Sequence, residues 1–350
     1  MAAWENNVRK IDPYVPGEQP SYADMVKLNT NENPYPPAPG VTKALKELDT
    51  DALRRYPKPD AHELTAALAE SCGVGFNNVF VGVGSDDVLG TAFLTFFKGR
   101  LPVLFPDVTY SFYPVWAALY DIPYETPALD ENFRIVKEDY YKLNGGIVIA
   151  NPNAPTTIAE PVSFIEDIVM HNQDSVVIVD EAYVDFGGET ALELTKKYEN
   201  LLVVRTFSKS RSMAGMRIGF AVGSEKLISY MMAVRNSYNS YTMTTPSILC
   251  GTESLKDEAY FRKTVDRIIA TRENAIPRFR KMGFKVLNSS ANFLFVTHEN
   301  VPAKEIFMKL RERHIFVRYF EKPRIDNYLR ITVGTDEEME KLFDALKEML

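Results

Sequence analysis

One lysine of this sequence stands between two serines at the point where an apolar segment ends. The stretch from 205 to 220 reads RTFSKSRSMAGMRIGF and follows LLVV, so Lys209 is expected in a loop after a strand. A lysine has a pKa of about 10.4 in water and is a nucleophile near neutral pH only where burial or a cation lowers that value. The serines and Arg217 supply hydroxyls and a cation. These are the parts of an imine-forming lysine beside a bound phosphate, although FSKS alone is more typical of an ordinary polar loop.

A second segment, GVGSDD at residues 82–87, lies between the strand-like NVFV and the helical VLGTAFLTFF. Backbone N–H groups at a helix start, with glycines that allow close approach, form an anion site. The pattern is a weak dinucleotide fingerprint, because a third glycine is missing and Asp87 stands in its place. A plain helix N-cap explains the segment equally well.

The third segment is SVVIVDEAYVDF, in which Asp180 ends an apolar strand. Open α/β sheets bind ligands at this edge. A carboxylate there could hold a protonated pyridine nitrogen, and Tyr183 could reach a neighbouring ring oxygen. VVIVDE also fits a magnesium site of the Walker B type, but the chain has no GxxxxGK[ST] motif and its four histidines are scattered. We therefore expect neither a nucleotide site nor a metal site.

Three further residues are chemically suggestive but ambiguous. Asn153 in ANPNAPTTI could donate a hydrogen bond to a ligand oxygen, or belong to a simple surface turn. Tyr110 in PDVTYSFY could stack on a planar ring, or belong to the core. Arg330 alternates with apolar residues in YLRITVG and could grip a carboxylate with two hydrogen bonds, or be solvated.

The elements that must position these residues follow an α/β rhythm. Short apolar runs recur between helical segments, namely NVFVGVG, LPVLFPD, GGIVIANP, SVVIVDEAY, NLLVVRTFS and IGFAVG, which indicates a largely parallel sheet. A charged helical region at 257–282 precedes a smaller α+β pattern. The first 40 residues are rich in Pro, Asn and Tyr, as expected of an extended arm. We predict an arm over 1–40, a large domain over 41–250 and a small domain over 251–350.

Composition narrows the class of protein. The chain has 350 residues, 45% of them hydrophobic, which suits a two-domain enzyme. Its net charge is −7 with no Lys/Arg block, so we expect no nucleic-acid partner. Cys72 and Cys250 form no CxxC pair, which argues against a disulfide framework and favours a reducing compartment. The N-terminus lacks the apolar region of a signal peptide and no apolar run nears the roughly 20 residues of a membrane span, so we expect a cytoplasmic protein without a membrane partner.

Together and in this order, the motifs resemble the fold type I pyridoxal-phosphate aminotransferases and, within them, the histidinol-phosphate aminotransferase family. The resemblance runs nearly end to end, from YVPGEQP and VKLNTNENPYPP through RYP, VGSDD, DVTYSFY, ANPNAPT, VDEAYVDF and RTFSKSRSMAGMRIGFAVG to SANFLF, VRYF and LRITVGT. It implies the α/β fold type I architecture, with a mostly parallel seven-stranded sheet between helices and a smaller α+β domain. It also implies a homodimer in which each active site takes residues from both chains.

The resemblance implies a role for each matched residue. Lys209 looks like the Schiff-base lysine, Asp180 like the partner of the pyridine nitrogen, and Asn153 and Tyr183 like the partners of the ring oxygen. The residues that would hold the cofactor phosphate are Ser85, Asp86, Ser208, Arg217 and, from the partner chain, Tyr56. Tyr110 would stack on the ring. The residues that would bind substrate are Arg330 for the α-carboxylate, Arg318 in VRYF for the substrate's phosphate, and Asn33 in the arm, which would help to close the pocket.

The implied reaction moves an amino group from L-histidinol phosphate to a 2-oxo acid, 2-oxoglutarate by analogy, through pyridoxal 5'-phosphate, in histidine biosynthesis and with ping-pong kinetics. Alternatives are an aromatic or other amino-acid aminotransferase, a phosphothreonine decarboxylase, and a protein that binds the cofactor without turnover, either silent or as a ligand-sensing regulator. The regulators carry an additional N-terminal DNA-binding module, which we do not expect here.

Three residues depart from the family's pattern. Thr157 follows Pro-Thr where the family usually has glycine, and a β-branched residue tolerates a positive φ poorly, which makes the local turn uncertain. Val83 stands in place of a common Asn, and Asp87 in place of a usual Glu. We expect these two changes to affect affinity or substrate choice rather than the core chemistry.

Overall fold

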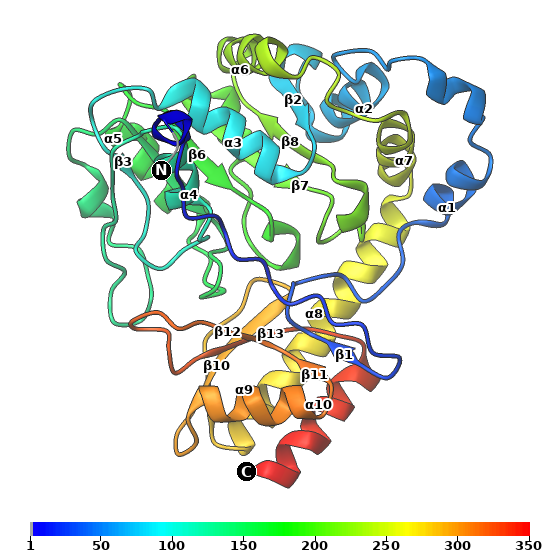
Figure 1. The fold of residues 1–350 in the computed structure, drawn as a ribbon, viewed down its shortest axis with the longest axis vertical. Coiled ribbons are helices and arrows are strands. Elements are labelled where there is room, and N and C mark those ends of the chain that lie inside the picture. The colour runs from blue at the N-terminus through cyan, green and yellow to red at the C-terminus, as the bar shows by residue number, and fades with distance from the viewer. Residues whose placement is uncertain (1–2) are drawn as a thin grey trace.

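A seven-stranded sheet forms the centre of the larger part of the molecule in the computed structural model, which describes residues 3–350 (Figure 1). Its strands, in order across the sheet, are β2 (Val79–Gly82), β8 (Gly219–Val222), β7 (Leu201–Thr206), β6 (Val177–Asp180), β5 (Gly146–Ala150), β3 (Val103–Leu104) and β4 (Tyr124–Glu125). In this sheet β8 runs antiparallel to both of its neighbours, and the other pairings are parallel. The predicted α/β fold with a mostly parallel sheet is confirmed.

Helices cover both faces of this sheet because its central strands are apolar on both faces. Val177 and Val179 pack into one core and Ile178 into the other, as the two-residue period of a strand requires. The first core contains side chains of α2 (His62–Cys72), α5 (Val162–His171) and α7 (Thr245–Lys256). The second contains side chains of α3 (Ser85–Phe96), α4 (Tyr113–Leu119) and α6 (Glu225–Tyr238). Within residues 3–350, no helix is long and apolar enough to cross a membrane.

The C-terminal part is a smaller sheet backed by helices. Its antiparallel strands, in order, are β12 (Arg318–Tyr319), β13 (Leu329–Thr332), β10 (Phe293–His298) and β9 (Phe284–Val286). The helices beside it are α8 (Glu258–Lys281), α9 (Ala303–Glu312) and α10 (Asp336–Met349), which share one apolar core with the sheet. The predicted charged helix corresponds to α8, and the predicted boundary at residue 250 falls inside α7.

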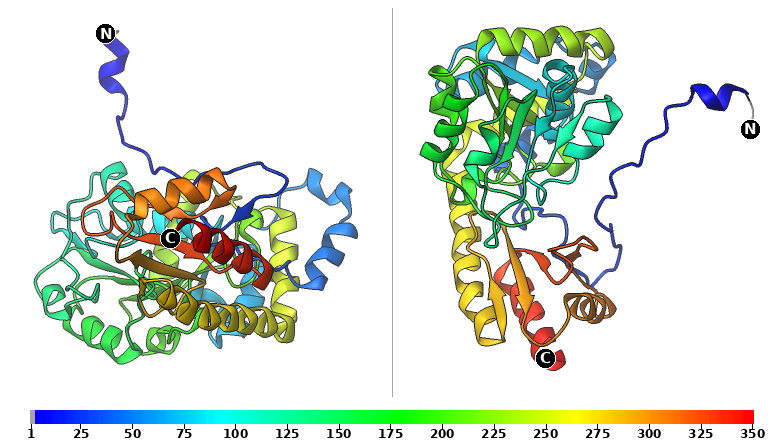
Figure 2. Two further views of the ribbon diagram at one scale, coloured as in Figure 1. Left: turned by 90° about the horizontal axis from the view of Figure 1, so that it is seen from below. Right: turned by 90° about the vertical axis from the view of Figure 1, so that its left-hand side faces the viewer.

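The buried apolar side chains of the N-terminal segment belong to the cores of the other parts, with Ala38 in the first core of the large sheet and Val26 and Leu28 in the core of the small sheet. The first residues of this segment project away from the rest of the chain (Figure 2), and Trp4 is 66% exposed. Further along, the Tyr14 ring stacks on Phe112 with centroids 4.2 Å apart. Beyond it, β1 (Val26–Lys27) pairs in parallel with β11 (Ile315–Phe316), and the two strands form a separate two-stranded sheet in the C-terminal part. Residues 1 and 2 of the predicted arm lie outside the described residues.

Short helices connect these elements. They are α1 (Pro39–Lys46) and the 3-10 helices η1 (Ala3–Asn7), η2 (Thr50–Arg54), η3 (Phe76–Asn78), η4 (Lys137–Tyr140), η5 (Val184–Phe186), η6 (Leu192–Lys196) and η7 (Ala214–Met216). Two of them follow strands that end at or shortly before predicted site residues. η5 comes after β6, and η7 lies between β7 and β8.

A buried arginine of α8 joins the large and small parts. Arg272 is 5% exposed, and its Nη1 donates to the carbonyls of Phe186, at 2.7 Å, and Ala291, at 2.9 Å. Phe186 belongs to η5 after β6, and Ala291 precedes β10. The guanidinium therefore satisfies two backbone carbonyls that come from opposite sides of the cleft between the parts.

We expect Arg272→Met to lower the free energy of unfolding by about 3 kcal/mol, because it leaves two carbonyls without their charged donor. Urea denaturation followed by circular dichroism measures the change. The matched control is Arg280→Met on the same helix, where the side chain is exposed and a change below about 0.5 kcal/mol is expected. Equal effects of the two substitutions would contradict the assignment.

Candidate active site

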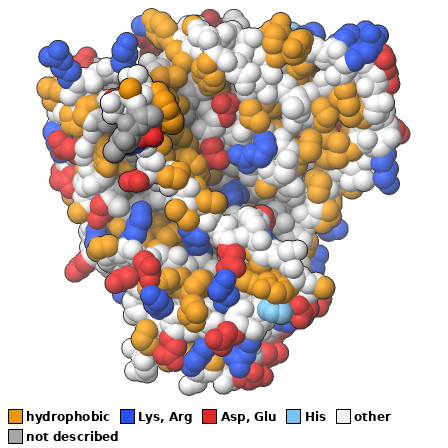
Figure 3. All heavy atoms as spheres, in the orientation of Figure 1, with side chains coloured by type: hydrophobic (Ala, Val, Ile, Leu, Met, Phe, Trp, Pro, Cys, Tyr) orange, Lys and Arg blue, Asp and Glu red, His pale blue; other side chains and the backbone are white. Residues whose placement is uncertain are grey.

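Most of the predicted residues line one cavity of about 200 Å³ between the large sheet, the arm and the small sheet. Those that line it are Ser85, Asp86, Tyr110, Asp180, Tyr183, Ser208, Lys209, Arg217, Arg318 and Arg330. The large-domain members come from loops and helix starts that follow strands of the sheet. On the face shown in Figure 3, basic side chains are visible in the hollow between the upper and lower parts.

Lys209 lies in the loop after β7 and points its amine into this cavity. Nζ donates to the carbonyl of Thr30 at 3.1 Å and lies 5.9 Å from the centre of the Tyr183 ring. Burial, together with the Arg330 cation, lowers the pKa of Lys209 to about 8. The neutral fraction of the amine near neutral pH is therefore far larger than that of a lysine in water, and the neutral form is the one that acts as a nucleophile or base.

Asp180 ends β6, and its carboxylate is buried beside the same cavity. Oδ2 accepts the hydroxyl proton of Tyr113 at 2.9 Å, and Oδ1 accepts the backbone N–H of Ala182 at 3.2 Å. Burial raises the pKa of Asp180 to about 6, although these hydrogen bonds oppose the shift. At neutral pH the group is a carboxylate that can hold a protonated ring nitrogen.

The start of α3 leaves a small space beside backbone N–H groups and a cation. Gly84 has φ +88°, and a Cβ on it would lie 2.5 Å from Nη2 of Arg217. A Cβ on Gly219 would lie 2.3 Å from the backbone nitrogen of Ser85, so β8 can come this close to the helix start only because residue 219 is glycine. Free N–H groups of the first turn and the Arg217 cation therefore face one small space, which suits a phosphate.

The side chains of Tyr110 and Arg217, which were predicted to contact a ligand, are hydrogen-bonded to Asp86. The Tyr110 hydroxyl donates to Asp86 at 2.8 Å, and Arg217 donates to the other oxygen of that carboxylate at 3.1 Å. These bonds fix the Tyr110 ring at the cavity wall. The Ser208 hydroxyl accepts from Thr206 at 2.9 Å, so its own proton remains to be donated.

The two predicted substrate arginines face each other across neighbouring strands. Arg318 in β12 is paired in register with Arg330 in β13, and both also line an adjoining cavity of about 270 Å³. Arg330 donates to the carbonyl of Asn29 at 2.6 Å, while its buried Nε has no partner among residues 3–350. Arg318 donates to the carbonyls of Val15 and Pro16 at 3.2 and 3.4 Å. The pair can bind an anionic group.

Three predicted residues do not line this cavity. Tyr56 is 80% exposed and stacks on Tyr241 at the surface. Asn153 is buried, and its amide donates to Val108 and Thr156, so both of its hydrogens are in use within the chain. The Asn33 amide donates to the carbonyl of Lys209 at 3.0 Å, so it holds the lysine's backbone. The predicted contacts of these three residues with a ligand stay predictions.

The departures from the family's pattern are accommodated locally. Thr157 adopts φ +70° despite its branched side chain, and its hydroxyl donates to the carbonyl of Asn288 at 3.0 Å. The turn thus forms without glycine. Asp87 accepts the backbone N–H of Val83 at 2.9 Å, which stabilises the loop before α3.

Two residues that belong to this site were not predicted. Tyr113 binds Asp180, and Asn31 in the arm donates to the Tyr183 hydroxyl at 2.9 Å. Tyr113 is the first residue of α4 and stands three positions after Tyr110, and the two rings lie edge to face with centroids 5.6 Å apart. Its closeness to Tyr110 in the sequence is a usable signal. Asn31 lies 152 positions from Tyr183. Only its place in the NTNENP motif could have drawn attention to it.

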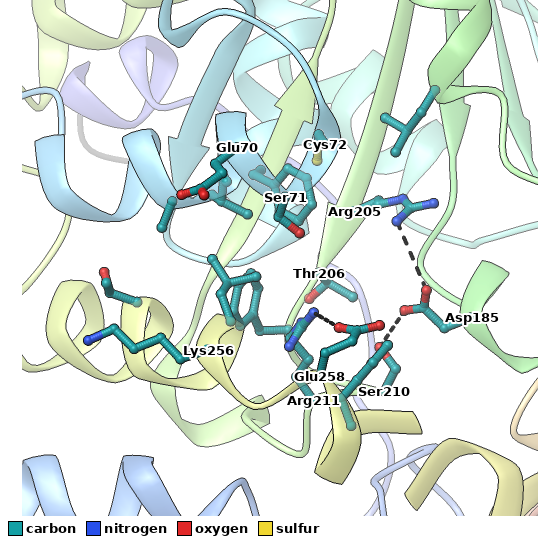
Figure 4. Close-up of a pocket in the computed structure, with 18 of the residues that line it drawn as sticks. Glu70, Ser71, Cys72, Asp185, Arg205, Thr206, Ser210, Arg211, Lys256 and Glu258 are labelled. Carbon is teal, nitrogen blue, oxygen red and sulfur yellow. Dashed lines mark hydrogen bonds and ion pairs between the residues drawn. The ribbon is translucent and has the colours of Figure 1, made fainter. Parts of the chain in front are cut away.

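A separate cavity, about 860 Å³, lies behind the Lys209 loop, and none of the predicted residues line it (Figure 4). Its charges are mainly paired with one another, since Arg205 donates to Glu181 at 2.9 Å and Arg211 lies 3.7 Å from Glu258. Ser210 donates to Asp185 at 2.5 Å. This network holds the loop on the side opposite to the Lys209 amine, so we assign it a structural role.

Comparisons with known proteins agree with this geometry. Residues 23–346 match the family model described as aminotransferase class I and II. The chain is 49% identical over 348 residues to the histidinol-phosphate aminotransferase of Lactococcus lactis subsp. cremoris, covering 99% of this chain and 98% of the relative.

Solved structures share the fold. The histidinol-phosphate aminotransferase of Sinorhizobium meliloti in complex with pyridoxal-5'-phosphate superposes with a TM-score of 0.83 at 22% identity, covering 92% of this chain and 91% of that one. The L-threonine-O-3-phosphate decarboxylase of Porphyromonas gingivalis gives 0.80 at 21% identity, covering 92% and 98%. At these identities the likeness establishes the fold and leaves the reaction open.

The lowered pKa of Lys209 predicts a pH-dependent stability. The pKa of Lys209 is about 8 in the folded chain and 10.5 for an unperturbed lysine, as in the unfolded chain. Below pH 8 the buried ammonium therefore destabilises the folded state. This destabilisation disappears as the pH rises from 8 to 10.5. We expect Lys209→Met to stabilise the ligand-free protein below pH 8, and this advantage to shrink by up to about 3 kcal/mol by pH 10.5.

Denaturant unfolding of the ligand-free protein at several pH values measures this difference. The matched control is Lys209→Arg, which keeps its charge throughout, so its stability relative to the native chain should fall over the same interval. A Lys209→Met difference that does not vary with pH would contradict the shifted pKa.

Proposed function

Because the chain belongs to the aminotransferase class I and II family and, within it, to the histidinol-phosphate aminotransferases, we propose that the cavity around Lys209 transfers the amino group of L-histidinol phosphate to 2-oxoglutarate. The enzyme is an aminotransferase of histidine biosynthesis, and its products are imidazole acetol phosphate and L-glutamate. The observation that carries this conclusion is 49% identity over almost the whole chain. On the sequence grounds given above, we also propose a cytoplasmic location.

The residues of the cavity fit pyridoxal 5'-phosphate. The glycine cradle at Gly84 and Gly219 leaves backbone N–H groups and Arg217 available to a phosphate. Asp180 would hold the ring nitrogen, and Lys209 would hold the aldehyde carbon. When bound, the cofactor supplies a carbonyl that takes up the amino group and a ring that withdraws electrons from the substrate's α-carbon.

Lys209 and Asp180 then have complementary roles in moving protons. With its pKa near 8, the Lys209 amine can take up a proton at Nζ from the α-carbon of the amino donor and, in the second half-reaction, give a proton to the α-carbon of the new amino acid. Asp180 remains ionised above about pH 6 and keeps a proton on the ring nitrogen, so negative charge from the α-carbon is stabilised. Tyr113 orients this carboxylate.

The arginine pair suits the anionic groups of both substrates. Arg330 has a buried Nε with no partner among residues 3–350, and Arg318 donates to arm carbonyls at 3.2 Å or more. We propose that Arg330 binds the α-carboxylate of the amino acid and Arg318 the phosphate of histidinol phosphate. A phosphate-binding arginine disfavours an aromatic aminotransferase, whereas a phosphothreonine decarboxylase would use the same group.

We further propose a homodimer with shared active sites. Tyr56 is 80% exposed and absent from the cavity of its own chain, and it stacks on Tyr241 at 4.5 Å. An exposed aromatic pair of this kind is typical of a protein interface. In the proposed dimer, Tyr56 reaches the cofactor phosphate bound by the partner subunit.

The two half-reactions can be followed separately by absorbance. Purified protein that is loaded with pyridoxal phosphate and then freed of unbound cofactor should retain the cofactor's absorbance band. Histidinol phosphate should bleach that band, and 2-oxoglutarate should restore it, with L-glutamate formed in equal amount. Lys209→Ala, which removes the amine while keeping the rest of the cavity, should bind cofactor but show neither change.

Phosphothreonine is the matched alternative substrate. Release of carbon dioxide from phosphothreonine, with no response to histidinol phosphate, would overturn the substrate assignment and leave the cofactor site intact. A band that no amino donor changes would indicate a protein that binds the cofactor without turnover.

Mixed dimers test the shared site. Lys209→Ala and Tyr56→Ala chains each impair the reaction, but a mixed dimer contains one site with Lys209 from one chain and Tyr56 from the other. If Tyr56 acts across the interface, mixing after reversible dissociation should raise the activity well above the sum of the separate variants. A mixture that shows only that sum would place Tyr56 outside the partner's site.

A further inference from the structure

We infer that Asn31 is a positioning residue that sets the direction of the Tyr183 hydrogen bond, so that the phenolic proton is offered to the cofactor. The inference rests on the proposed function, because it assumes that pyridoxal phosphate occupies the cavity beside Tyr183. Asn31 is 1% exposed, and it comes from the arm, whereas Tyr183 follows β6 of the large sheet.

The orientation of the Asn31 amide follows from its bonds to Thr332. The backbone N–H of Asn31 donates to the Thr332 hydroxyl oxygen at 3.0 Å. That hydroxyl therefore turns its own proton to Oδ1 of Asn31, 3.1 Å away. The side-chain carbonyl of Asn31 is thus committed to Thr332, and its NH₂ group faces the other way.

The NH₂ group lies against Tyr183. Nδ2 of Asn31 is 2.9 Å from the Tyr183 hydroxyl, and an amide nitrogen can only donate. The phenol oxygen must accept this bond, so its proton points elsewhere. Within residues 3–350 the Tyr183 hydroxyl donates no hydrogen bond, and the residue lines the cavity. An acceptor on a ligand in the cavity would receive the proton.

The charges around Tyr183 keep it protonated. Burial raises the pKa of Tyr183, with contributions from Asp180 at the end of β6 and Asp86 in α3, while Arg330 in β13 and the bond from Asn31 oppose the shift. Lys209 in the loop after β7 lies 5.9 Å from the ring centre. The phenol is therefore neutral near neutral pH and can donate its proton. The bond from Asn31 determines in which direction the O–H group points.

The backbone of Asn31 is suited to this task. Its φ is +56°, a conformation that Asn, Asp and Gly adopt more readily than other residues. Its carbonyl accepts from Asn292 at 3.0 Å, so the residue is held from both ends by the small-domain strands β10 and β13 and their flanks. Replacement by Asp keeps the shape and the backbone conformation and exchanges the donor for an acceptor.

Asn31→Asp therefore gives a sharp test. A carboxylate at this place would draw the Tyr183 proton toward itself and away from the cofactor's ring oxygen, and it would favour protonation of the nitrogen that links the cofactor to Lys209. We expect the pH midpoint of the bound cofactor's absorbance change to rise by about one unit or more. Spectral titration of the loaded protein without substrate measures it.

Two variants separate this effect from a simple change in charge. Asn29→Asp adds the same charge to the same arm segment, where the side chain instead donates to the carbonyl of Glu18, and should shift the midpoint by less than half as much. In a Tyr183→Phe background, Asn31→Asp should cause a markedly smaller shift, because the hydroxyl through which it acts is gone.

An unchanged midpoint in Asn31→Asp, or an equal shift with and without the Tyr183 hydroxyl, would overturn the inference. Both outcomes leave the proposed function intact, since the cofactor band would still be present and respond to substrate. If the native protein shows no cofactor band, the proposed function fails instead, so the two failures are distinguishable. Circular dichroism of each variant checks that it has folded.

Discussion

The burial of one lysine amine beside an arginine is the constraint on which the rest of the structure depends. Lys209 loses much of its hydration and lies in the field of Arg330, and both effects favour the neutral amine. A chain that buries a cation in this way must hold it firmly, or the side chain would move out to water. The Thr30 carbonyl accepts a hydrogen bond from its amine, and the Asn33 amide donates to its backbone carbonyl. The next residue, Ser210, donates to Asp185 in the cavity on the other side of the loop.

The large sheet makes this arrangement possible by bringing distant segments to one edge. Because β6 and β7 are parallel neighbours, Asp180 and the loop that carries Lys209 emerge on the same side. Antiparallel β8 then returns toward the start of α3, where two glycines allow a close approach that no other residue would permit. The cavity thus has an acidic end at Asp180 and a basic, N–H-rich end at Arg217. This polarity matches a ring that carries a basic nitrogen and a phosphate.

Sequence patterns predicted those parts of the site in which a functional residue directly follows a strand in the chain. Apolar strands followed by polar residues located Lys209 and Asp180, and the fold class followed from the same rhythm. The pattern could not reveal Asn31, since its contacts with Tyr183 and Thr332 join residues 152 and 301 positions apart. It also could not tell that the Asn153 amide is engaged with Val108. Thr157 shows the converse, because a distant carbonyl at Asn288 stabilises a turn that local preference disfavours.

The pairing of β1 with β11 attaches the arm to the C-terminal part, where Val26 and Leu28 pack in the same apolar core as the small sheet. The backbone N–H of Thr332 donates to the Leu28 carbonyl at 2.9 Å, which extends this attachment to the residues next to the cavity. Arg330 donates to the Asn29 carbonyl, and Lys209 donates to the neighbouring Thr30 carbonyl. The guanidinium and the amine are therefore anchored on two consecutive residues of the arm, although they come from different parts of the chain.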